Sequence, residues 1–278
     1  MNVEHLPPLG KSLSAVGLTA RRRLGQHFLL DLNICRKIVR LADPRPGELV
    51  LEVGPGPGGL TRALLEAGAR VIAVEKDARF APLLADLATA AAGRLTVVGG
   101  DALDLDESVL AELEEDKAQV IANLPYNVGS ALLLRWLIGP FRPHSMTLMF
   151  QRELAGRIVA PPGGSDYGRL SLIAQVLCET KILMELPARA FTPPPKVDSS
   201  VTHFRARTPR PGDELVEALQ IVGRAAFGQR RKMLRSSLQA LGGESLCLRA
   251  GVDPALRAQN VPIEGYLSLA EAWLRRSI

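Results

Sequence analysis

The chain has 278 residues, of which 47% are apolar and 23% charged, so it is predicted to be a globular protein with a sizeable core and not a disordered chain. It contains no run of about 18 apolar residues and no apolar segment behind a basic N-terminus, so neither a membrane span nor an export signal is expected. Its three cysteines lie far apart and form no paired spacing with the four histidines, so no metal site or disulfide is predicted and a cytoplasmic location is expected.

A basic arm precedes the first predicted helix. It contains Arg21, Arg22 and Arg23 and runs through the stretch ARRRLGQHFLLD to Asp31. Aspartate is a preferred N-cap residue because its side chain accepts hydrogen bonds from the free N–H groups of a first helical turn. We therefore expect a helix that begins just after Asp31.

From about residue 47, the sequence alternates short strands with longer helices. Such alternation predicts a mostly parallel sheet that is covered by helices on both faces. Strands are indicated by β-branched runs bounded by Gly, Pro, Asp or Asn, and helices by length and apolar spacing. The predicted strands are 48–53, 70–75, 94–98, 119–123, 145–150 and 181–186, and the predicted helices between them are 60–68, 80–93, 129–138 and 152–160.

The C-terminal quarter has a different pattern. The stretch FRARTPRPGDEL at 204–215 is rich in Pro, Arg and Gly, which is typical of a linker. We predict two domains on this basis, an α/β domain at 1–207 that includes the basic arm and a small all-helical domain at 208–278. Helical pieces are expected near 214–227, 230–241, 245–250 and 264–275.

A glycine-rich turn follows the first predicted strand. Gly54, Gly56 and Gly59 satisfy the pattern G-x-G-x-x-G, and Glu75 follows at about the interval of a ribose-binding acid. On spacing alone, the ligand could be a nicotinamide dinucleotide. A glycine-rich first turn also occurs in α/β proteins without a nucleotide, so the neighbouring residues decide between these readings.

Those neighbours favour a cationic nucleoside. Pro55 and Pro57 remove two N–H donors that a diphosphate would need. Glu52 would repel a diphosphate, whereas it can attract an α-amino group or a sulfonium. Asp101 closes the third strand, where it could accept a hydrogen bond from the amine of an adenine. Because the carboxyl ends of strands are where open sheets bind ligands, we predict S-adenosylmethionine as the cofactor.

The fourth strand ends on the sequence Asn123-Leu124-Pro125-Tyr126. The exocyclic amine of adenine is a poor nucleophile, and acceptors aimed at its protons would hold it as it becomes pyramidal. The Asn123 side chain and the Leu124 carbonyl can be those acceptors, since Pro125 biases Leu124 toward an extended backbone. Tyr126 offers a face on which a base can stack. The alternative is a simple turn in which Tyr126 packs.

Six ordered motifs lie between about residues 19 and 275. They are GQHFL (25–29), EVGPGPGGLT (52–61), NLPYNVGS (123–130), MFQRELAGRI (149–158), FTPPPKVDSS (191–200) and FGQRRKMLRSSL (227–238). Together they resemble those of the small-subunit ribosomal RNA adenine dimethyltransferase family. This resemblance implies a Rossmann-like class I methyltransferase domain with a small helical C-terminal domain. It also implies dimethylation of two adjacent adenosines in a hairpin near the 3′ end of that RNA, late in small-subunit assembly.

The resemblance also implies roles for single residues. The N-terminal motif would close over the methionine end of the donor, with Gly54 beneath it, while Glu75 would hold the ribose and Asp101 the adenine of the donor. Asn123 would bridge donor and substrate, and Phe191 would form the second stacking face around a flipped-out adenine. Without the resemblance, a phenylalanine ahead of three prolines would be interpreted as a packing residue, and its position in the family motif reverses that preference. The residues expected to bind the donor are Gln26, His27, Leu29, Glu52, Gly54, Gly56, Glu75, Asp101 and Asn123.

Basic residues gather in the C-terminal quarter. No acidic residue lies between Glu217 and Glu244, a stretch with five cations within twelve positions. A solvated helix face could explain any single one of them. Together with the basic arm and a net charge of +5, the cluster predicts contacts with RNA phosphates. The residues expected to contact RNA are Arg21, Arg22, Arg23, Arg224, Arg230, Arg231, Lys232 and Arg235.

Three other functions stay open from the sequence. A related large-subunit ribosomal RNA methyltransferase would share the crevice motifs, although FTPPPKV and FGQRRKMLRSSL fit the small-subunit enzyme better. The chain could act chiefly as an assembly checkpoint that binds immature subunits. A dehydrogenase is the most remote of the three. No long exposed apolar stripe is apparent, so we expect a monomer.

Overall fold

The computed structural model describes the chain except at residues 1, 2, 4, 5, 16, 22–24, 106–108, 110, 112, 114–117 and 276–278. The chain forms two compact units, which consist of Met1–Arg152 with Ile182–Phe204 and of Glu153–Lys181 with Arg205–Ile278. This division differs from the predicted one at residue 207. Residues 153–181 belong to the second unit because the helix at Arg169–Leu177 packs on the C-terminal helices.

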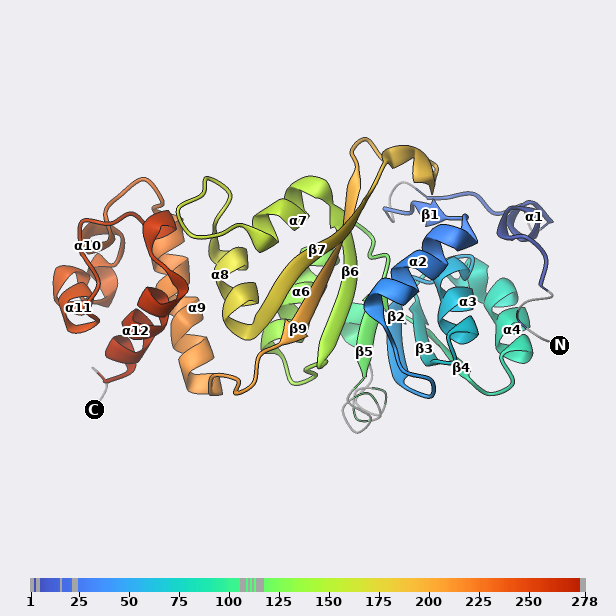
Figure 1. Ribbon diagram of the computed structural model, residues 1–278, viewed down its shortest axis with the longest axis horizontal. Helices are drawn as coiled ribbons and strands as arrows, with labels where there is room; N and C mark the ends of the chain where they lie inside the picture. The colour runs from blue at the N-terminus through green and yellow to red at the C-terminus, as the bar shows by residue number, and fades with distance from the viewer. Residues whose placement is uncertain are drawn as a thin grey trace. The chain divides into compact units, whose positions relative to one another are not determined.

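A seven-stranded sheet has the order β4-β3-β2-β5-β6-β9-β7 (Figure 1). The pairs β2–β3, β3–β4, β2–β5 and β5–β6 are parallel, which confirms the predicted parallel sheet. All six predicted strands are present, and β9 was not predicted because its sequence lies between two proline-rich stretches. The strands are β2 (Leu49–Val53), β3 (Arg70–Glu75), β4 (Leu95–Gly99), β5 (Gln119–Ala122), β6 (Ser145–Gln151), β7 (Cys178–Leu186) and β9 (Ser199–Ala206).

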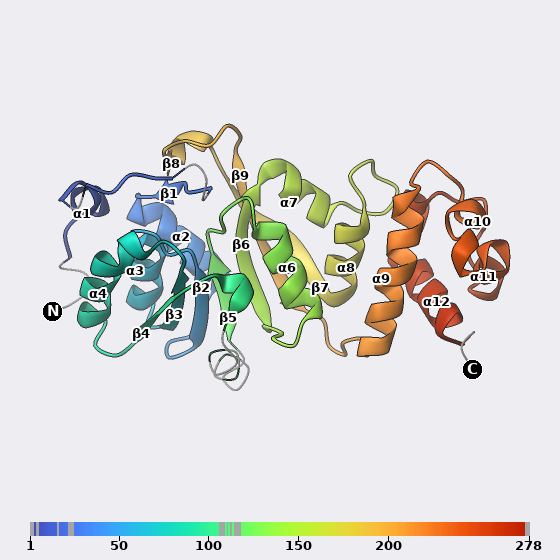
Figure 2. The ribbon, with the colours of Figure 1, turned by 180° about the vertical axis from the view of Figure 1, so that it is seen from behind.

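Helices cover both faces of the sheet in the first unit. In Figure 1, α2 (Leu32–Ala42) lies in front of the strands, and in Figure 2 α6 (Gly129–Ile138) lies in front of them. Every residue of β2 and β5 is buried for this reason, as expected for central parallel strands. The N–H of Asn33 donates to the Asp31 side chain at 2.8 Å, so the predicted cap of α2 is confirmed.

The other helices of this unit whose bounds are described lie before, between or after the strands in chain order. Of these, α3 and α4 match predicted helices, whereas α1 and the short 3₁₀ helices η3, η4 and η5 were not predicted from the sequence. They are α1 (Leu9–Ala15), α3 (Gly59–Glu66), η3 (Ala78–Phe80), α4 (Ala81–Ala90), η4 (Ala102–Asp104) and η5 (Ala188–Ala190).

A two-stranded antiparallel sheet ties the N-terminal arm to the first unit. In it, β1 (Phe28–Leu29) pairs with β8 (Phe191–Thr192), and Leu29 lies opposite Phe191. Phe28 packs in a small core with Leu13, Phe80 and Leu84. The arm is therefore held both by strand pairing and by apolar contacts.

The second unit is helical in its C-terminal part. Among the described residues after Ala206 there is no strand beyond an isolated bridge between Met233 and Arg257. The rings of Tyr167 and Tyr266 both pack on Phe227. The predicted helix at 230–241 is shorter because 229–233 form a turn. The helices are α7 (Arg152–Val159), α8 (Arg169–Leu177), α9 (Asp213–Gly228), α10 (Leu234–Ser237), η6 (Gln239–Leu241), α11 (Gly243–Arg249), η7 (Ala258–Asn260) and α12 (Ile263–Leu274).

No helix in the described ranges has both the length and the apolar character that a membrane crossing requires.

Candidate active site

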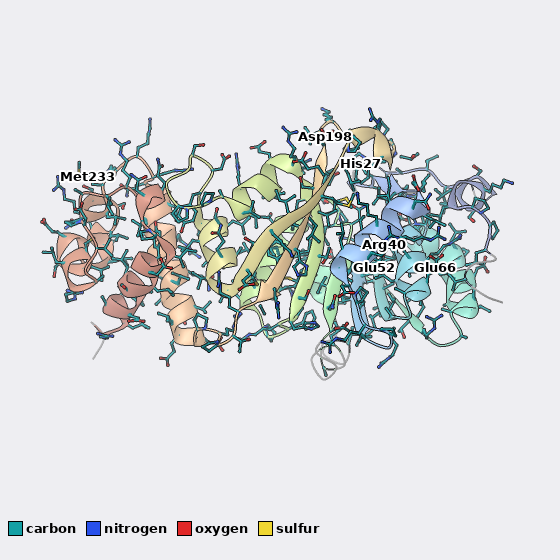
Figure 3. The ribbon with its side chains drawn as sticks, viewed as in Figure 1. His27, Arg40, Glu52, Glu66, Asp198 and Met233 are labelled. Atoms are coloured by element: carbon teal, nitrogen blue, oxygen red, sulfur yellow. The ribbon has the colours of Figure 1, made fainter. Side chains whose placement is uncertain are left out.

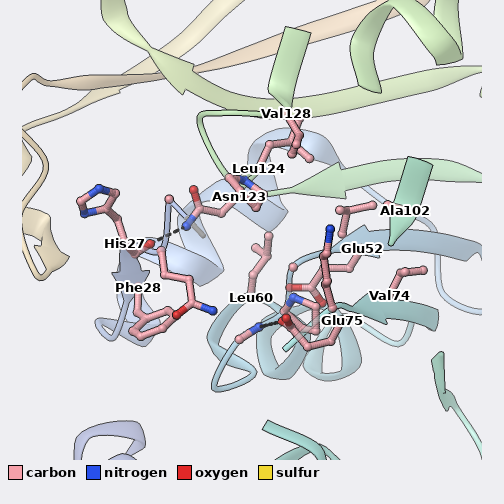
Figure 4. A pocket seen from close by; sticks show the side chains of 18 of the residues that line it. His27, Phe28, Glu52, Leu60, Val74, Glu75, Ala102, Asn123, Leu124 and Val128 are labelled. Atoms are coloured by element: carbon pink, nitrogen blue, oxygen red, sulfur yellow. Dashed lines mark hydrogen bonds between the residues drawn. The ribbon is translucent and has the colours of Figure 1, made fainter. Parts of the chain in front are cut away.

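A pocket lies at the carboxyl ends of β2, β3, β4 and β5, and residues of the N-terminal arm complete its wall (Figure 4). This is where parallel sheets bind ligands, because the loops that follow neighbouring strands converge there. The predicted residues that line it are Gln26, His27, Leu29, Glu52, Gly54, Gly56, Glu75, Asp101, Asn123, Leu124, Pro125 and Tyr126.

The glycine loop and Glu75 form the lower wall of the pocket. The N–H of Gly56 donates to one Glu75 oxygen at 3.0 Å, and the N–H of Asp77 donates to the other at 2.8 Å. Gly54 and Gly56 have φ values of +70° and +52°, and a Cβ at Gly56 would meet the Phe28 ring at 3.1 Å. Burial raises the pKa of Glu75. Its oxygens retain lone pairs for further donors, such as two ribose hydroxyls.

Glu52 lies at the floor of the pocket and is 1% exposed. Its Oε2 has no hydrogen-bond partner within the described part of the chain. Burial raises the pKa of this carboxyl to about 8 because a charge is poorly solvated there. A buried acid with one oxygen left without a partner fits a ligand that carries a positive charge, which would restore the ionised form.

Asp101 is held by a lysine that the sequence reasoning missed. Lys76 Nζ lies 2.6 Å from one Asp101 oxygen, and the N–H of Leu103 donates to the other at 3.0 Å. The hydrogen bond from Lys76 lowers the pKa of Asp101. An adenine amine that binds Asp101 would therefore share the carboxylate with Lys76. The position of Lys76 directly after Glu75, the predicted ribose-binding acid, was the available signal in the sequence.

Asn123 has a fixed orientation in the pocket. Its Nδ2 donates to the backbone oxygen of His27 at 3.0 Å, as drawn in Figure 4. Among the described residues, neither Asn123 Oδ1 nor the Leu124 carbonyl has a hydrogen-bond partner. Both predicted acceptors are thus available at the edge of the pocket.

Tyr126 lies beside these acceptors and is anchored at both its hydroxyl and its ring. Its hydroxyl lies 2.6 Å from Ser199 Oγ at the start of β9. The ring stacks on that of His27, with the centroids 5.4 Å apart and an angle of 28° between the planes. His27 Nδ1 in turn lies 2.8 Å from the carbonyl oxygen of Pro193. Two aromatic rings therefore stand at the mouth of the pocket.

Phe191, the predicted second stacking face for the substrate adenine, is not among the residues that line this pocket. Its side chain is 2% exposed and packs in the core cluster that includes Leu29, Leu186 and Val201. Pairing of β8 with β1 holds it there, since Leu29 lies opposite Phe191 in the register. The structure therefore supports the packing alternative for Phe191, and the ring beside Tyr126 is that of His27.

Comparison with known proteins bears on this site. A family model described as ribosomal RNA adenine dimethylase matches residues 17–274. The chain belongs to this family. It is 60% identical over 276 residues to a protein from Phenylobacterium zucineum (strain HLK1) named ribosomal RNA small subunit methyltransferase A, a match that covers 99% of this chain and 96% of the relative. The resemblance inferred from the motifs is thereby confirmed.

Solved structures bear out the fold. A dimethyladenosine transferase from Plasmodium falciparum has a TM-score of 0.73 at 23% identity, with 91% of this chain and 99% of that chain covered. The 23S ribosomal RNA methyltransferase ErmE has a TM-score of 0.68 at 27% identity, with 88% and 98% covered. The predicted Rossmann-like methyltransferase fold with a helical C-terminal region is confirmed.

The predicted RNA-contacting residues of this family member differ in their surroundings. Arg224, Arg231, Lys232 and Arg235 are exposed on α9, α10 and the turn between them, as is Met233 in the same turn (Figure 3). Arg21 is exposed as well. Arg22 and Arg23 lie outside the described residues.

Arg230, which was also predicted to contact RNA, differs from its exposed neighbours because its side chain is bound within the protein. Its Nε donates to Gln259 Oε1 at 3.0 Å, and its terminal nitrogen donates to the carbonyls of Gly164 and Ser165. The side chain thus joins the 161–168 loop to η7 within the second unit. These partners come from segments that are distant in the sequence. The position of Arg230 within a run of basic residues could therefore not predict its contacts.

Proposed function

We propose that this protein transfers methyl groups from S-adenosylmethionine to the exocyclic amines of adenosines in small-subunit ribosomal RNA, forming dimethyladenosine. The observation that carries this is the Asn123 amide, whose nitrogen is bound to His27 and whose oxygen is left free at the edge of the pocket. The membership in the ribosomal RNA adenine dimethylase family supports the same reaction.

The donor fits the part of the pocket that is lined by the glycine loop, Glu52 and Glu75. S-adenosylmethionine supplies a methyl group on a sulfonium, which leaves as a neutral thioether. Glu52 presents a buried oxygen without a partner to the cationic end, and Glu75 presents oxygens to the ribose. Gly54 and Gly56 keep the loop free of side chains, and Asp101 faces the adenine. Gln26, His27 and Leu29 close the pocket from the arm.

The substrate adenine would bind at the part of the pocket that is lined by Asn123, Leu124 and Tyr126. Asn123 Oδ1 and the Leu124 carbonyl would accept hydrogen bonds from the two protons of its amine and so hold the nitrogen as it becomes pyramidal. Pro125 shapes the turn that exposes this carbonyl, and Tyr126 offers its face to the base. No strong base is needed, because the amine can lose its proton after the methyl group has moved.

The proposal also specifies the ribosomal particle and the site in the RNA on which the protein acts. We infer that the protein acts as a monomer in the cytoplasm on immature small subunits, where it modifies two adjacent adenosines in a hairpin near the 3′ end of the RNA. The name of the Phenylobacterium relative supports the small subunit, and the chain's own FTPPPKV and FGQRRKMLRSSL motifs favour the same assignment.

The test is transfer from labelled S-adenosylmethionine to small subunits that lack the modification, followed by mass analysis of the digested nucleosides. Dimethyladenosine is expected with these subunits and not with mature ones. Transfer to large-subunit RNA instead would contradict the proposal and favour the second candidate, to which the fold likeness to ErmE points. If the protein binds the donor but transfers no methyl group, the proposed substrate is contradicted and the proposed donor is not.

The exposed cations of α9 and α10 would contact the phosphates of the RNA. Exposed arginine and lysine side chains bind phosphate without reading sequence, and they release counterions when they do so. This basic surface consists of Arg224, Arg231, Lys232 and Arg235. Arg230 is left out because its guanidinium is bound within the unit.

Reversal of charge at Arg231 and Lys232 together is expected to weaken RNA binding by about 10-fold or more at low salt and to flatten its salt dependence. Titrations of small-subunit RNA at several salt concentrations would measure both effects, and donor affinity should not change. The matched control is Arg249→Glu with Arg275→Glu, which changes the net charge equally at the end of α11 and just after α12. Equal losses in both double variants, or an unchanged salt slope, would contradict a local phosphate contact.

A further inference from the structure

Asp77 is a buried acid next to the pocket that no function described so far uses. It is 5% exposed and follows the ribose-binding acid by two residues. Arg79 Nε lies 2.9 Å and 3.1 Å from its two oxygens. The hydrogen bond from Arg79 holds the pKa of Asp77 well below its usual range, so the carboxylate stays ionised at working pH.

The Asp77 carboxylate also binds the N-terminal arm. Gln26 Nε2 donates to Asp77 Oδ2 at 3.0 Å, and Gln26 Oε1 accepts from the N–H of Arg21 at 2.8 Å. Arg79 donates in addition to the carbonyl oxygen of Thr19 at 3.2 Å. The arm is therefore fastened to the Asp77–Arg79 pair at two places. The amide of Gln26 is occupied by these contacts, which makes it a connector between the arm and the sheet.

The next residue of the arm carries the connection to the other side of the pocket. The His27 backbone oxygen accepts from Asn123, and its ring stacks on Tyr126. Gln26 and His27 are adjacent in the chain. The Gln26–Asp77 hydrogen bond holds this dipeptide on the side of the pocket proposed for the donor. The contacts of His27 with Asn123 and Tyr126 hold it on the side proposed for the substrate. The N–H of Asp77 also donates to Glu75. Asp77 thus contacts both the ribose-binding acid and the segment that orients Asn123.

We propose that Asp77 is a positioning residue for methyl transfer, which holds Gln26 so that the segment Gly25–Leu29 closes the donor pocket and the His27 carbonyl orients Asn123. The expected effect of Asp77 on methyl transfer rests on the proposed function. The expected effect of Asp77 on donor affinity requires only that the pocket binds the donor. The link spans 51 positions of sequence and joins two segments that have no strand pairing with each other.

A simpler role is possible for an aspartate at this position. Asp77 is the N-cap of η3, where its Oδ1 accepts from the N–H of Arg79 at 3.3 Å. Serine is an equally good cap but is too short to reach Gln26. The variant Asp77→Ser therefore keeps the cap and removes the connection to the arm. Gln26→Met removes the same connection from the other side and leaves the cap untouched.

The experiment compares Asp77→Ser, Gln26→Met and the double variant for the dissociation constant of S-adenosylmethionine and for the single-turnover transfer rate at saturating donor. Loss of a hydrogen bond to a charged group corresponds to about 10-fold or more in affinity. We expect each single variant to weaken donor binding by about that factor and to slow transfer further. The double variant is expected to lose less than the sum of the two single losses, because both substitutions remove the same Gln26–Asp77 contact.

The matched control is Asp253→Ser, since Asp253 caps a turn in the second unit by accepting from the N–H of Ala255 at 2.8 Å. It should bind the donor as the unaltered protein does. Unchanged donor affinity and rate in Asp77→Ser would overturn the proposal and leave Asp77 a cap. Additive losses in the double variant would overturn it too. If the unaltered protein binds the donor but transfers no methyl group, the proposed function fails, while the affinity comparison still tests the connection.

Discussion

Replacement of Asn123 by alanine is expected to lower the methyl-transfer rate by about 10²- to 10³-fold, the usual effect of removing one preorganised group that stabilises a transition state. The Asn123 oxygen is the acceptor proposed to hold the amine, and the alanine variant leaves only the Leu124 carbonyl. The basic surface is unaltered, so binding to small subunits should stay within a few-fold of the original. Single-turnover transfer and subunit binding would be measured separately.

Two further variants sharpen this test. Asn123→Asp keeps an acceptor but cannot donate to the His27 carbonyl, so it should also be slow if orientation matters. Asn33→Ala, an exposed asparagine on α2, is the matched control and should transfer at the original rate. A fast Asn123→Ala protein would contradict the assignment of the acceptor. If the alanine variant binds subunits and blocks their maturation, a checkpoint role accompanies catalysis.

Donor affinity is expected to rise with pH up to about pH 8, where the pKa of Glu52 lies in the ligand-free protein. A cationic ligand favours the ionised carboxylate, whereas burial favours the neutral acid below this pH. Binding below pH 8 therefore requires loss of a proton, which weakens affinity by about 10-fold per pH unit, or about 100-fold between pH 8 and pH 6. Calorimetry over this range would measure the slope.

Glu52→Gln is the control for this pH dependence, because it has no proton to lose. Titration of the donor's own amino group is common to both proteins, so only the steeper slope of the original protein reports Glu52. The ligand-free protein offers a second readout. Because the folded pKa is raised from 4.5 to about 8, the contribution of Glu52 to stability is present below pH 4.5 and is lost as pH rises to 8. Equal pH profiles of the two proteins would contradict this role of Glu52.

Local sequence patterns predicted much of the first unit. All six predicted strands are present, and the central parallel ones stand out in the sequence because they are apolar on both faces. Asp31 capped its helix as predicted, since capping depends on neighbouring residues alone. Parallel strands end at one edge of a sheet, so the sequence alone places Glu52, Glu75, Asp101 and Asn123 at one pocket.

Contacts between distant segments were decided only by the tertiary structure. Burial of Phe191 follows from the pairing of β8 with β1, and the contacts of Arg230 follow from the packing of η7 and the 161–168 loop. The bond between Gln26 and Asp77 joins segments 51 positions apart. The sequence by itself determined the family, six of the seven strands of the main sheet and the chemical types that face the pocket. Tertiary packing determined which side chains stay free for ligands, because a residue's partners depend on segments that its local pattern does not encode.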